Sequence, residues 1–182
     1  MADLPPPRTP GEYRIALVCL GNICRSPMAH VVLAERVAEA GLADRVTLTS
    51  SGTGGWHVGN PMDDRAAATL THAGYDASRH RARRFEPAWL DELDLALAMD
   101  RQNLADLADL ADPVSGRRER VRLFRDFDPQ EPGGEVPDPY YGGSDGFEEV
   151  LTMVERTAAS LVDRLALVLA GHRADPPGSR SR

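Results

Sequence analysis

Short apolar runs alternate with longer amphipathic segments along this chain. The short runs predict buried β-strands, at residues 13–18, 45–50, 93–99 and 121–124. Segments with an apolar residue at every third or fourth position predict helices, at residues 27–40, 63–73, 101–111 and 147–170, with a short helix at 89–92. Strands that alternate with helices form parallel sheets with crossover helices. We therefore expect an α/β fold, in which one domain has a central four-stranded parallel sheet and helices on both faces.

Two long segments follow neither period. Residues 51–61 contain four glycines, and residues 127–145 contain four prolines and four glycines, so both are predicted to be loops. Loops as long as the second are usually functional. Internal repeats and domain boundaries are not visible. We expect a flexible N-terminal extension at 1–11, one domain at 12–171 and a disordered tail at 172–182.

Composition narrows the class of protein. The 182 residues suit one domain, and the net charge of −7 argues against a nucleic-acid partner. The N-terminus lacks the apolar region of a secretory signal, and no run reaches the roughly 20 apolar residues of a membrane span. The two cysteines lie in one short segment and cannot cross-link distant parts of the fold. We expect a cytoplasmic protein without a membrane partner, although export without a signal stays open.

The segment after the first predicted strand has the chemistry of an anion site. Cys19 follows the strand, Arg25 stands six positions later, and Ser26 and Pro27 suit the N-cap and first position of the next helix. Backbone N–H groups in such a loop, together with the helix dipole, attract negative charge. Cys19 is therefore expected as a thiolate nucleophile. Arg25 can bind two oxygens of one phosphate. The sequence predicts a phosphate-binding loop that attacks phosphorus.

Cleavage of a phosphate ester also needs an acid for the leaving group, and Asp138 is the candidate. Prolines flank it on a rigid loop, and Tyr140 and Tyr141 follow as aromatic residues that could form the wall of a pocket for an aryl group. Asp138 must be protonated when it acts, and a bound phosphate nearby favours that form. The same carboxylate can then take a proton from the water that hydrolyses a phosphocysteine.

These motifs resemble those of the low-molecular-weight protein tyrosine phosphatases. The sequence CLGNICRSP at residues 19–27 is similar to the signature of this family, and DPYY at 138–141 is similar to its acid loop. The resemblance runs from about residue 13 to residue 171, and the stretch 56–59 is most similar to bacterial members. It implies hydrolysis of phosphotyrosine in proteins, and of small aryl phosphates, without a cofactor.

The resemblance also implies a role for each residue of the site. Cys19 is the nucleophile, Arg25 binds the phosphate and stabilises the transition state, and Asp138 is the general acid. Ser26 helps the sulfur leave, while Asn22 holds the loop in shape through a left-handed backbone and a bond to Ser50. The other members of the phosphate-binding loop are Leu20, Gly21, Ile23 and Cys24. The substrate pocket is predicted from Trp56, Tyr140 and Tyr141, with Asp100 and His80 as supporting polar residues.

Two features of the sequence, Cys24 and the arginine-rich segment 79–84, each have two interpretations. Cys24 is either a packing residue of the loop or a redox partner that forms a disulfide with Cys19 and shields it from irreversible oxidation. The arginine-rich segment 79–84 is either a solvated face or an attraction for acidic phosphopeptides. A tyrosine kinase that modifies Tyr140 or Tyr141 is a candidate partner. The five histidines have no metal-ligand spacing, so no metal is expected.

Three other functions compete with this interpretation. Arsenate reductases are similar in loop and fold but relay electrons through further cysteines, and none follows Cys24 here. Protein-arginine phosphatases are similar too, with threonine at the position of Ile23. A non-catalytic phosphate-binding module would not need the thiol, the guanidinium and the carboxyl group together.

Overall fold

The computed structural model describes residues 3–111 and 116–171. Its strands are β1 (Tyr13–Cys19), β2 (Val46–Gly52), β3 (Leu95–Ala98) and β4 (Val121–Leu123), and its α-helices are α1 (Arg25–Glu39), α2 (Asp64–His72), α3 (Arg101–Leu110) and α4 (Ser144–Gly171). Three short 3₁₀ helices complete the set: η1 (Pro87–Asp91), η2 (Arg117–Arg120) and η3 (Phe124–Phe127). The predicted tail at 172–182 lies outside the described residues.

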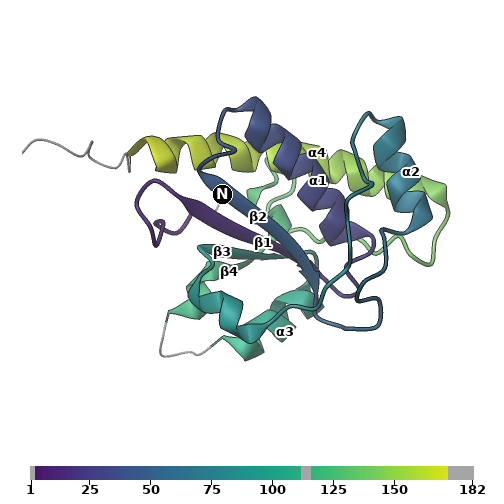
Figure 1. The fold of residues 1–182 in the computed structure, drawn as a ribbon, viewed down its shortest axis with the longest axis horizontal. Coiled ribbons are helices and arrows are strands. Elements are labelled where there is room, and N and C mark those ends of the chain that lie inside the picture. The colour runs from purple at the N-terminus through teal and green to yellow at the C-terminus, as the bar shows by residue number, and fades with distance from the viewer. Residues whose placement is uncertain (1–2, 112–115, 172–182) are drawn as a thin grey trace, which may run out of the picture.

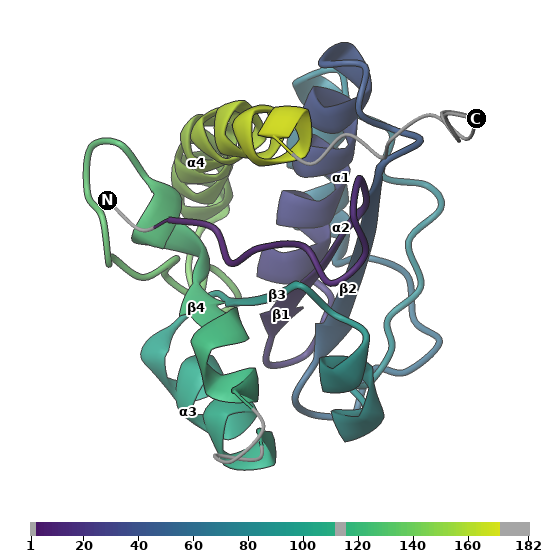
Figure 2. The same ribbon diagram turned by 90° about the vertical axis from the view of Figure 1, so that its left-hand side faces the viewer.

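The four strands form one parallel sheet in the order β2-β1-β3-β4. Alternate residues of β1 point to opposite faces, as the two-residue period of a strand requires. Ile15 and Leu17 belong to the core under α1 and α4, whereas Ala16 and Val18 belong to the core under α3. Figures 1 and 2 show α1 and α4 on one side of the sheet and α3 on the other. The predicted single-domain α/β fold with helices on both faces is confirmed.

The order of the strands determines where a ligand can bind. The chain moves from β1 to β2 on one side and then returns past β1 to β3 on the other. This reversal leaves a crevice beyond the carboxyl ends of the strands, where ligands of open α/β sheets usually bind. Cys19 ends β1 at this edge, and α1 begins six residues later.

The observed elements differ from the predicted ones mainly at their ends. The third strand is shorter than residues 93–99 because Leu93 closes the turn of η1 through a bond to Trp89 O. The next residue, Asp94, turns its buried carboxylate to the backbone N–H groups of Arg8 and Arg14. The fourth strand ends before Phe124, which starts η3.

The N-terminal segment is joined to the domain by hydrogen bonds. The sequence predicts a flexible extension at 1–11, and within the described part of it Arg8 donates to Asp94, Leu93 O and Leu90 O. Tyr13 Oη donates to Pro5 O at 2.9 Å. The segment passes along the edge of the sheet that lies opposite the carboxyl ends of the strands (Figure 2).

No helix among residues 3–111 and 116–171 is both long enough and apolar enough to cross a membrane.

Candidate active site

The loop between β1 and α1 turns its carbonyl groups away from its centre. Each of these oxygens accepts a hydrogen bond from outside the loop: Cys19 O from Thr53 N, Leu20 O from Gly54 N, Asn22 O from His80 Nε2 and Ile23 O from Asp63 N. In a trans peptide the N–H points opposite to the C=O. The N–H groups of the following residues therefore face the inside of the loop, where they can bind an anion together with the N-terminus of α1.

Gly52 at the end of β2 allows this loop to lie close. A Cβ atom on that glycine would stand 2.6 Å from Leu20 O, closer than atoms tolerate. Gly52 is a residue of the site that the sequence analysis did not identify. The sequence gives little indication of this role, because a glycine at the start of a glycine-rich loop is usually explained by turn formation.

Asn22 holds the loop from within. It has a φ of 57°, the left-handed region that asparagine tolerates better than most residues. Its side-chain amide donates to Ser26 Oγ at 2.9 Å and Ser50 Oγ at 3.1 Å, and its side-chain oxygen accepts from Arg83 N at 2.9 Å. Asn22 is fully buried, so these bonds replace those it would make to water.

Cys19 Sγ lies at the centre of the loop with two polar neighbours. Asn22 N donates to the sulfur at 3.2 Å, and Ser26 Oγ lies 3.0 Å from it. Both groups can stabilise a negative charge on the sulfur. The prediction of Ser26 as the N-cap of the helix is wrong. The helix already begins at Arg25 after Cys24, and the Ser26 hydroxyl is turned to the sulfur instead.

Arg25 is buried and fixed by acceptors from two distant segments. Its Nη1 donates to Asp100 Oδ2 at 2.6 Å and to Val136 O at 3.2 Å, and its Nη2 donates to Asp138 Oδ2 at 3.1 Å. Burial acts to lower the pKa of this guanidinium, but the negative charges of Cys19, Asp138 and Asp100 outweigh burial and raise it. Arg25 is therefore a permanent cation beside the sulfur.

Asp138 reaches this cation from the long loop before α4. One carboxylate oxygen accepts from Arg25 and the other from Tyr140 N at 3.2 Å. Val136 N donates to Met99 O at 2.8 Å, which ties the loop to the end of β3. The structure thus brings Cys19, Arg25 and Asp138 to one place, although Asp138 follows the other two by more than a hundred residues.

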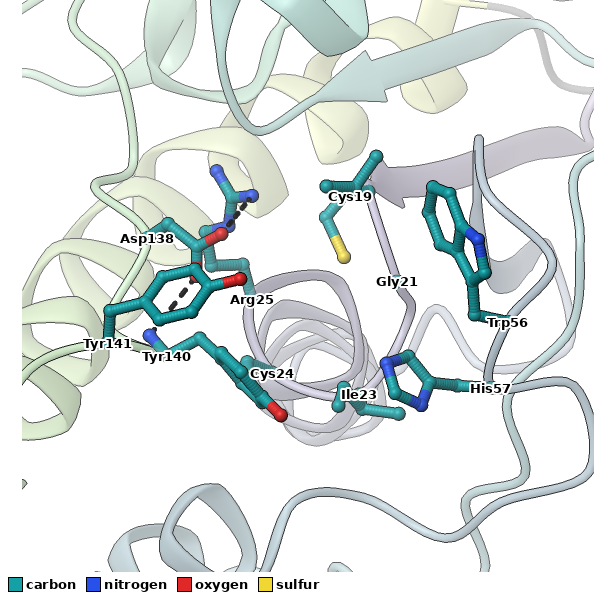
Figure 3. Close-up of a pocket in the computed structure, with 11 residues that line it drawn as sticks. Cys19, Gly21, Ile23, Cys24, Arg25, Trp56, His57, Asp138, Tyr140 and Tyr141 are labelled. Atoms are coloured by element: carbon teal, nitrogen blue, oxygen red, sulfur yellow. Dashed lines mark hydrogen bonds and ion pairs between the residues drawn. The ribbon is translucent and has the colours of Figure 1, made fainter.

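These groups open into a pocket of about 330 Å³. Figure 3 shows Trp56 and His57 on one side of it and Asp138, Tyr140 and Tyr141 on the other, with Cys19 Sγ between them. Trp56 and Tyr141 are 74% and 92% exposed, so their rings form the rim of the pocket rather than part of the core. Leu20, Gly21, Ile23 and Cys24 also line the pocket.

His57 is a pocket residue that the sequence analysis did not identify as part of the site. Its ring lies so close to the loop that a Cβ on Gly21 would stand 3.1 Å from His57 Cδ2. In the sequence, the feature that points to His57 is its position next to Trp56, which is predicted to line the substrate pocket.

Cys24 lines the same pocket but is in a different electrostatic state. Burial, together with the charges of Asp63, Cys19 and Asp138, raises the pKa of the Cys24 thiol to about 12. This thiol is protonated at neutral pH and does not compete with Cys19 as a nucleophile. In the described part of the chain both cysteines are free. No cluster of three or more His, Cys, Asp or Glu side chains there is placed to hold a metal ion.

The fold and this loop define an α/β protein with a thiol at the centre of the loop that joins its first strand to its first helix. Known proteins are similar to it. The family model of the low molecular weight phosphotyrosine protein phosphatases matches residues 14–168. A low molecular weight protein-tyrosine-phosphatase of Streptomyces coelicolor is 49% identical over 152 residues, which cover 82% of this chain and 92% of the relative. Low molecular weight protein-tyrosine phosphatase A of Mycobacterium tuberculosis is 42% identical over 151 residues, covering 82% and 89%.

Solved structures agree with these relatives. A protein tyrosine phosphatase from Entamoeba histolytica, crystallised with Hepes in its active site, superimposes with a TM-score of 0.81 at 30% identity, covering 86% of this chain and 98% of that chain. YfkJ from Bacillus subtilis superimposes with a TM-score of 0.78 at 31% identity, covering 89% and 98%. The chain belongs to the low molecular weight phosphotyrosine protein phosphatase family.

Proposed function

We propose that this protein hydrolyses phosphotyrosine in proteins through a phosphocysteine intermediate. The family supports the substrate class, since the relatives are named as protein-tyrosine phosphatases. The observation that carries the mechanism is the convergence of three groups at one pocket. The Cys19 sulfur lies in a ring of inward N–H groups, and the Arg25 guanidinium donates to the Asp138 carboxylate beside it.

In the first step the sulfur attacks phosphorus and the bond from phosphorus to the aryl oxygen breaks. The loop N–H groups and Arg25 bind the phosphoryl oxygens, where charge develops in the transition state. Asp138 gives its proton to the departing phenol oxygen. A phosphate dianion next to the carboxyl group favours the protonated form that this step needs.

In the second step water attacks the phosphocysteine. Asp138, now ionised, takes a proton from that water, the bond from sulfur to phosphorus breaks, and inorganic phosphate leaves. The Ser26 hydroxyl, 3.0 Å from the sulfur, donates to the thiolate as it forms. Apart from the attacking water, no group outside the enzyme and its substrate is needed to balance either step.

The rim of the pocket favours an aryl group on the phosphate. Trp56 stands opposite Tyr140 and Tyr141 (Figure 3), and a phenyl ring between such walls gains stacking contacts that an alkyl phosphate lacks. Ile23 gives the floor an apolar side chain. Direct competition between phosphotyrosine and phosphoarginine peptides tests this preference, and faster turnover of phosphoarginine would favour the arginine phosphatase instead. Thioredoxin-coupled reduction of arsenate by the pure protein would favour the reductase.

Asp138→Asn tests the acid. We expect kcat/KM, which reports the first step alone, to fall by roughly 10²–10³ with phenyl phosphate, and by much less with p-nitrophenyl phosphate, because p-nitrophenolate leaves without a proton. The parent enzyme should lose activity as pH rises, since its acid is active only when protonated, and the variant should lose that part of the profile. Equal losses of kcat/KM on both substrates, or a parent profile flat from pH 5 to about 8, would contradict the role of Asp138 as the acid.

Cys19→Ser is the companion variant. It should lose turnover and keep binding of a phosphotyrosine peptide, because the anion site is made by backbone groups and Arg25. Its thermal unfolding serves as the control for an intact fold.

A further inference from the structure

A second pocket lies behind the phosphate-binding loop. Its volume is about 390 Å³, within the range of pockets that take small molecules. It is lined by His30 of α1, Ser50 of β2 and four residues of the segment 79–83: Arg79, His80, Arg81 and Arg83. We call it the rear pocket. It shares no lining residue with the pocket that contains Cys19.

The rear pocket carries positive charge that the rest of the fold does not neutralise. Asp76 is the carboxylate in its lining, and it pairs with Arg79 at 3.9 Å. Arg81 donates to the carbonyl groups of Ser78 and His80, and Arg83 donates to Ser50 O. Within residues 3–111 and 116–171, neither Arg81 nor Arg83 forms an ion pair with a carboxylate. The rear pocket is thus positively charged, although the chain as a whole has a net charge of −7.

The two histidines respond to this field. Burial, His80 and Arg83 lower the pKa of His30 to about 4. Burial, with the charges of Arg81 and Arg83, also lowers the pKa of His80, against the effect of its bond to Asn22. Burial is the larger cause of both shifts, and the part that comes from Arg81 and Arg83 has the sign of a positive field, which attracts an anion.

Asn22 separates the rear pocket from the pocket that contains Cys19, which we call the catalytic pocket. Asn22 belongs to the phosphate-binding loop, residues 19–25, which we call the catalytic loop. Gly21 and Ile23 on either side of it line the catalytic pocket. Three of the bonding partners of Asn22 line the rear pocket: Ser50 Oγ at 3.1 Å, Arg83 N at 2.9 Å and His80 Nε2 at 2.7 Å. Any ligand that moves His80 or Arg83 therefore acts directly on the residue that holds the catalytic loop.

We propose that the rear pocket is a binding site for a small phosphate-bearing anion, and that its occupancy is transmitted to the catalytic loop through Asn22. Arginine side chains suit this ligand, because a guanidinium binds two phosphate oxygens at once. The site is distinct from the catalytic one, so the proposal does not depend on the reaction proposed above.

Histidine ring signals in NMR can test the two pockets separately, with inorganic pyrophosphate as the probe on the full chain. His57 reports the catalytic pocket, His30 and His80 report the rear pocket, and His72 at the end of α2 is a reference. With orthovanadate present to fill the catalytic pocket, pyrophosphate should still shift the His30 and His80 signals along one saturable curve. Shifts confined to His57, or shifts that sodium chloride reproduces at equal ionic strength, would overturn the site.

The double variant Arg79→Gln/Arg81→Gln tests which charges bind the probe. We expect it to raise the dissociation constant of pyrophosphate roughly tenfold or more. The matched control, Arg118→Gln/Arg122→Gln, removes the same charge at η2 and β4 and should leave that constant almost unchanged. Equal effects of the two double variants would show that net charge alone attracts the anion and would overturn the site.

The side-chain amide of Asn22 tests the coupling. Its NMR signal should move along the same binding curve as those of His30 and His80. If the histidines respond and the Asn22 amide does not, transmission to the catalytic loop is wrong.

Discussion

At the scale of single residues, two cysteines five positions apart have opposite properties. Cys19 Sγ has Asn22 N and Ser26 Oγ beside it, whereas the Cys24 thiol is buried near carboxylates that raise its pKa to about 12. Burial and negative neighbours keep a thiol protonated, and hydrogen-bond donors favour a thiolate. Position in the loop thus gives two chemically identical side chains different neighbours, and the neighbours of Cys19 are those that the proposed reaction needs.

Cys24→Ser tests whether the second thiol protects the first. Peroxide converts the Cys19 thiolate to a sulfenic acid, and attack by the Cys24 sulfur would release water and form a disulfide that added thiols can reduce. We expect the parent to regain most of its activity with dithiothreitol after peroxide treatment, and the variant to regain much less. Equal recovery by the two proteins would leave Cys24 as a packing residue. Turnover before oxidation is the control.

At the scale of elements, side chains join segments of the site that are far apart in the sequence. Arg65 at the start of α2 is an example. Its guanidinium bonds to Asp63 at 3.0 Å and lies 5.5 Å from the ring centre of Tyr140 and 4.8 Å from that of Phe147. Asp63 N in turn donates to Ile23 O of the catalytic loop. Arg65 thus connects the catalytic loop, the acid loop and the beginning of α4.

Arg65→Ala should loosen the acid loop. A cation beside a partly exposed ring such as Tyr140 contributes about 0.5–1 kcal/mol, a contact with a buried ring such as Phe147 contributes more, and both would be lost. We expect KM for aryl phosphates to rise several-fold through Tyr140, with a smaller fall in kcat through Asp138. Arg65→Lys keeps the charge without the planar group, so its KM should lie between those of the parent and of Arg65→Ala.

The control for this effect is Arg36→Ala, which removes an exposed ion pair with Glu39 on α1. If Arg65→Ala lowers thermal stability and leaves KM at the value of the control, Arg65 has a structural role alone.

At the scale of the whole molecule, a buried charge cluster joins α4 to the end of the sheet. Asp128 is fully buried, accepts two bonds from Arg156 of α4 at 2.7 and 2.6 Å, and accepts a third from Arg125 of η3 at 2.9 Å. Burial acts to raise the pKa of Asp128, but the bonds from Arg156, Gln130 and Arg125 outweigh it and lower that pKa well below the ordinary range. Because the folded pKa is lower than the unfolded one, this contribution to stability is present above the unfolded pKa of about 4 and is lost as pH falls below it.

Asp128→Asn should lower the free energy of unfolding by roughly 3–5 kcal/mol at pH 7, since it removes the buried carboxylate that pairs with Arg156 and with Arg125, which keeps its pair with Glu131. The difference from the parent should shrink as pH falls below about 4 toward the lower folded pKa, because the unfolded parent binds a proton in this range that the folded parent does not. Urea unfolding at several pH values measures both effects. Asp76→Asn, which breaks an exposed pair with Arg79, is the control, and an equally small loss in both variants would contradict the prediction.

The sequence by itself determined the order of elements and the chemistry of the site. Apolar runs and helical periods are local signals, and they located the four strands and four α-helices to within a few residues. The spacing of Cys19 and Arg25 around a short loop after a strand indicated an anion site, and two prolines around Asp138 indicated a rigid acid. Both interpretations needed only neighbouring residues.

The tertiary structure alone decided how these pieces meet. Ser26 suits an N-cap by residue type, yet its hydroxyl faces the Cys19 sulfur because α1 begins one residue earlier. The acceptors that fix Arg25 come from the ends of other segments, and the partners of Asn22 come from β2 and the segment 80–83. Strand order and register set these distances, and hydrophobic periodicity does not encode either. The rear pocket could not be predicted for the same reason. No local pattern in the sequence shows that an arginine-rich segment lies against the back of the catalytic loop.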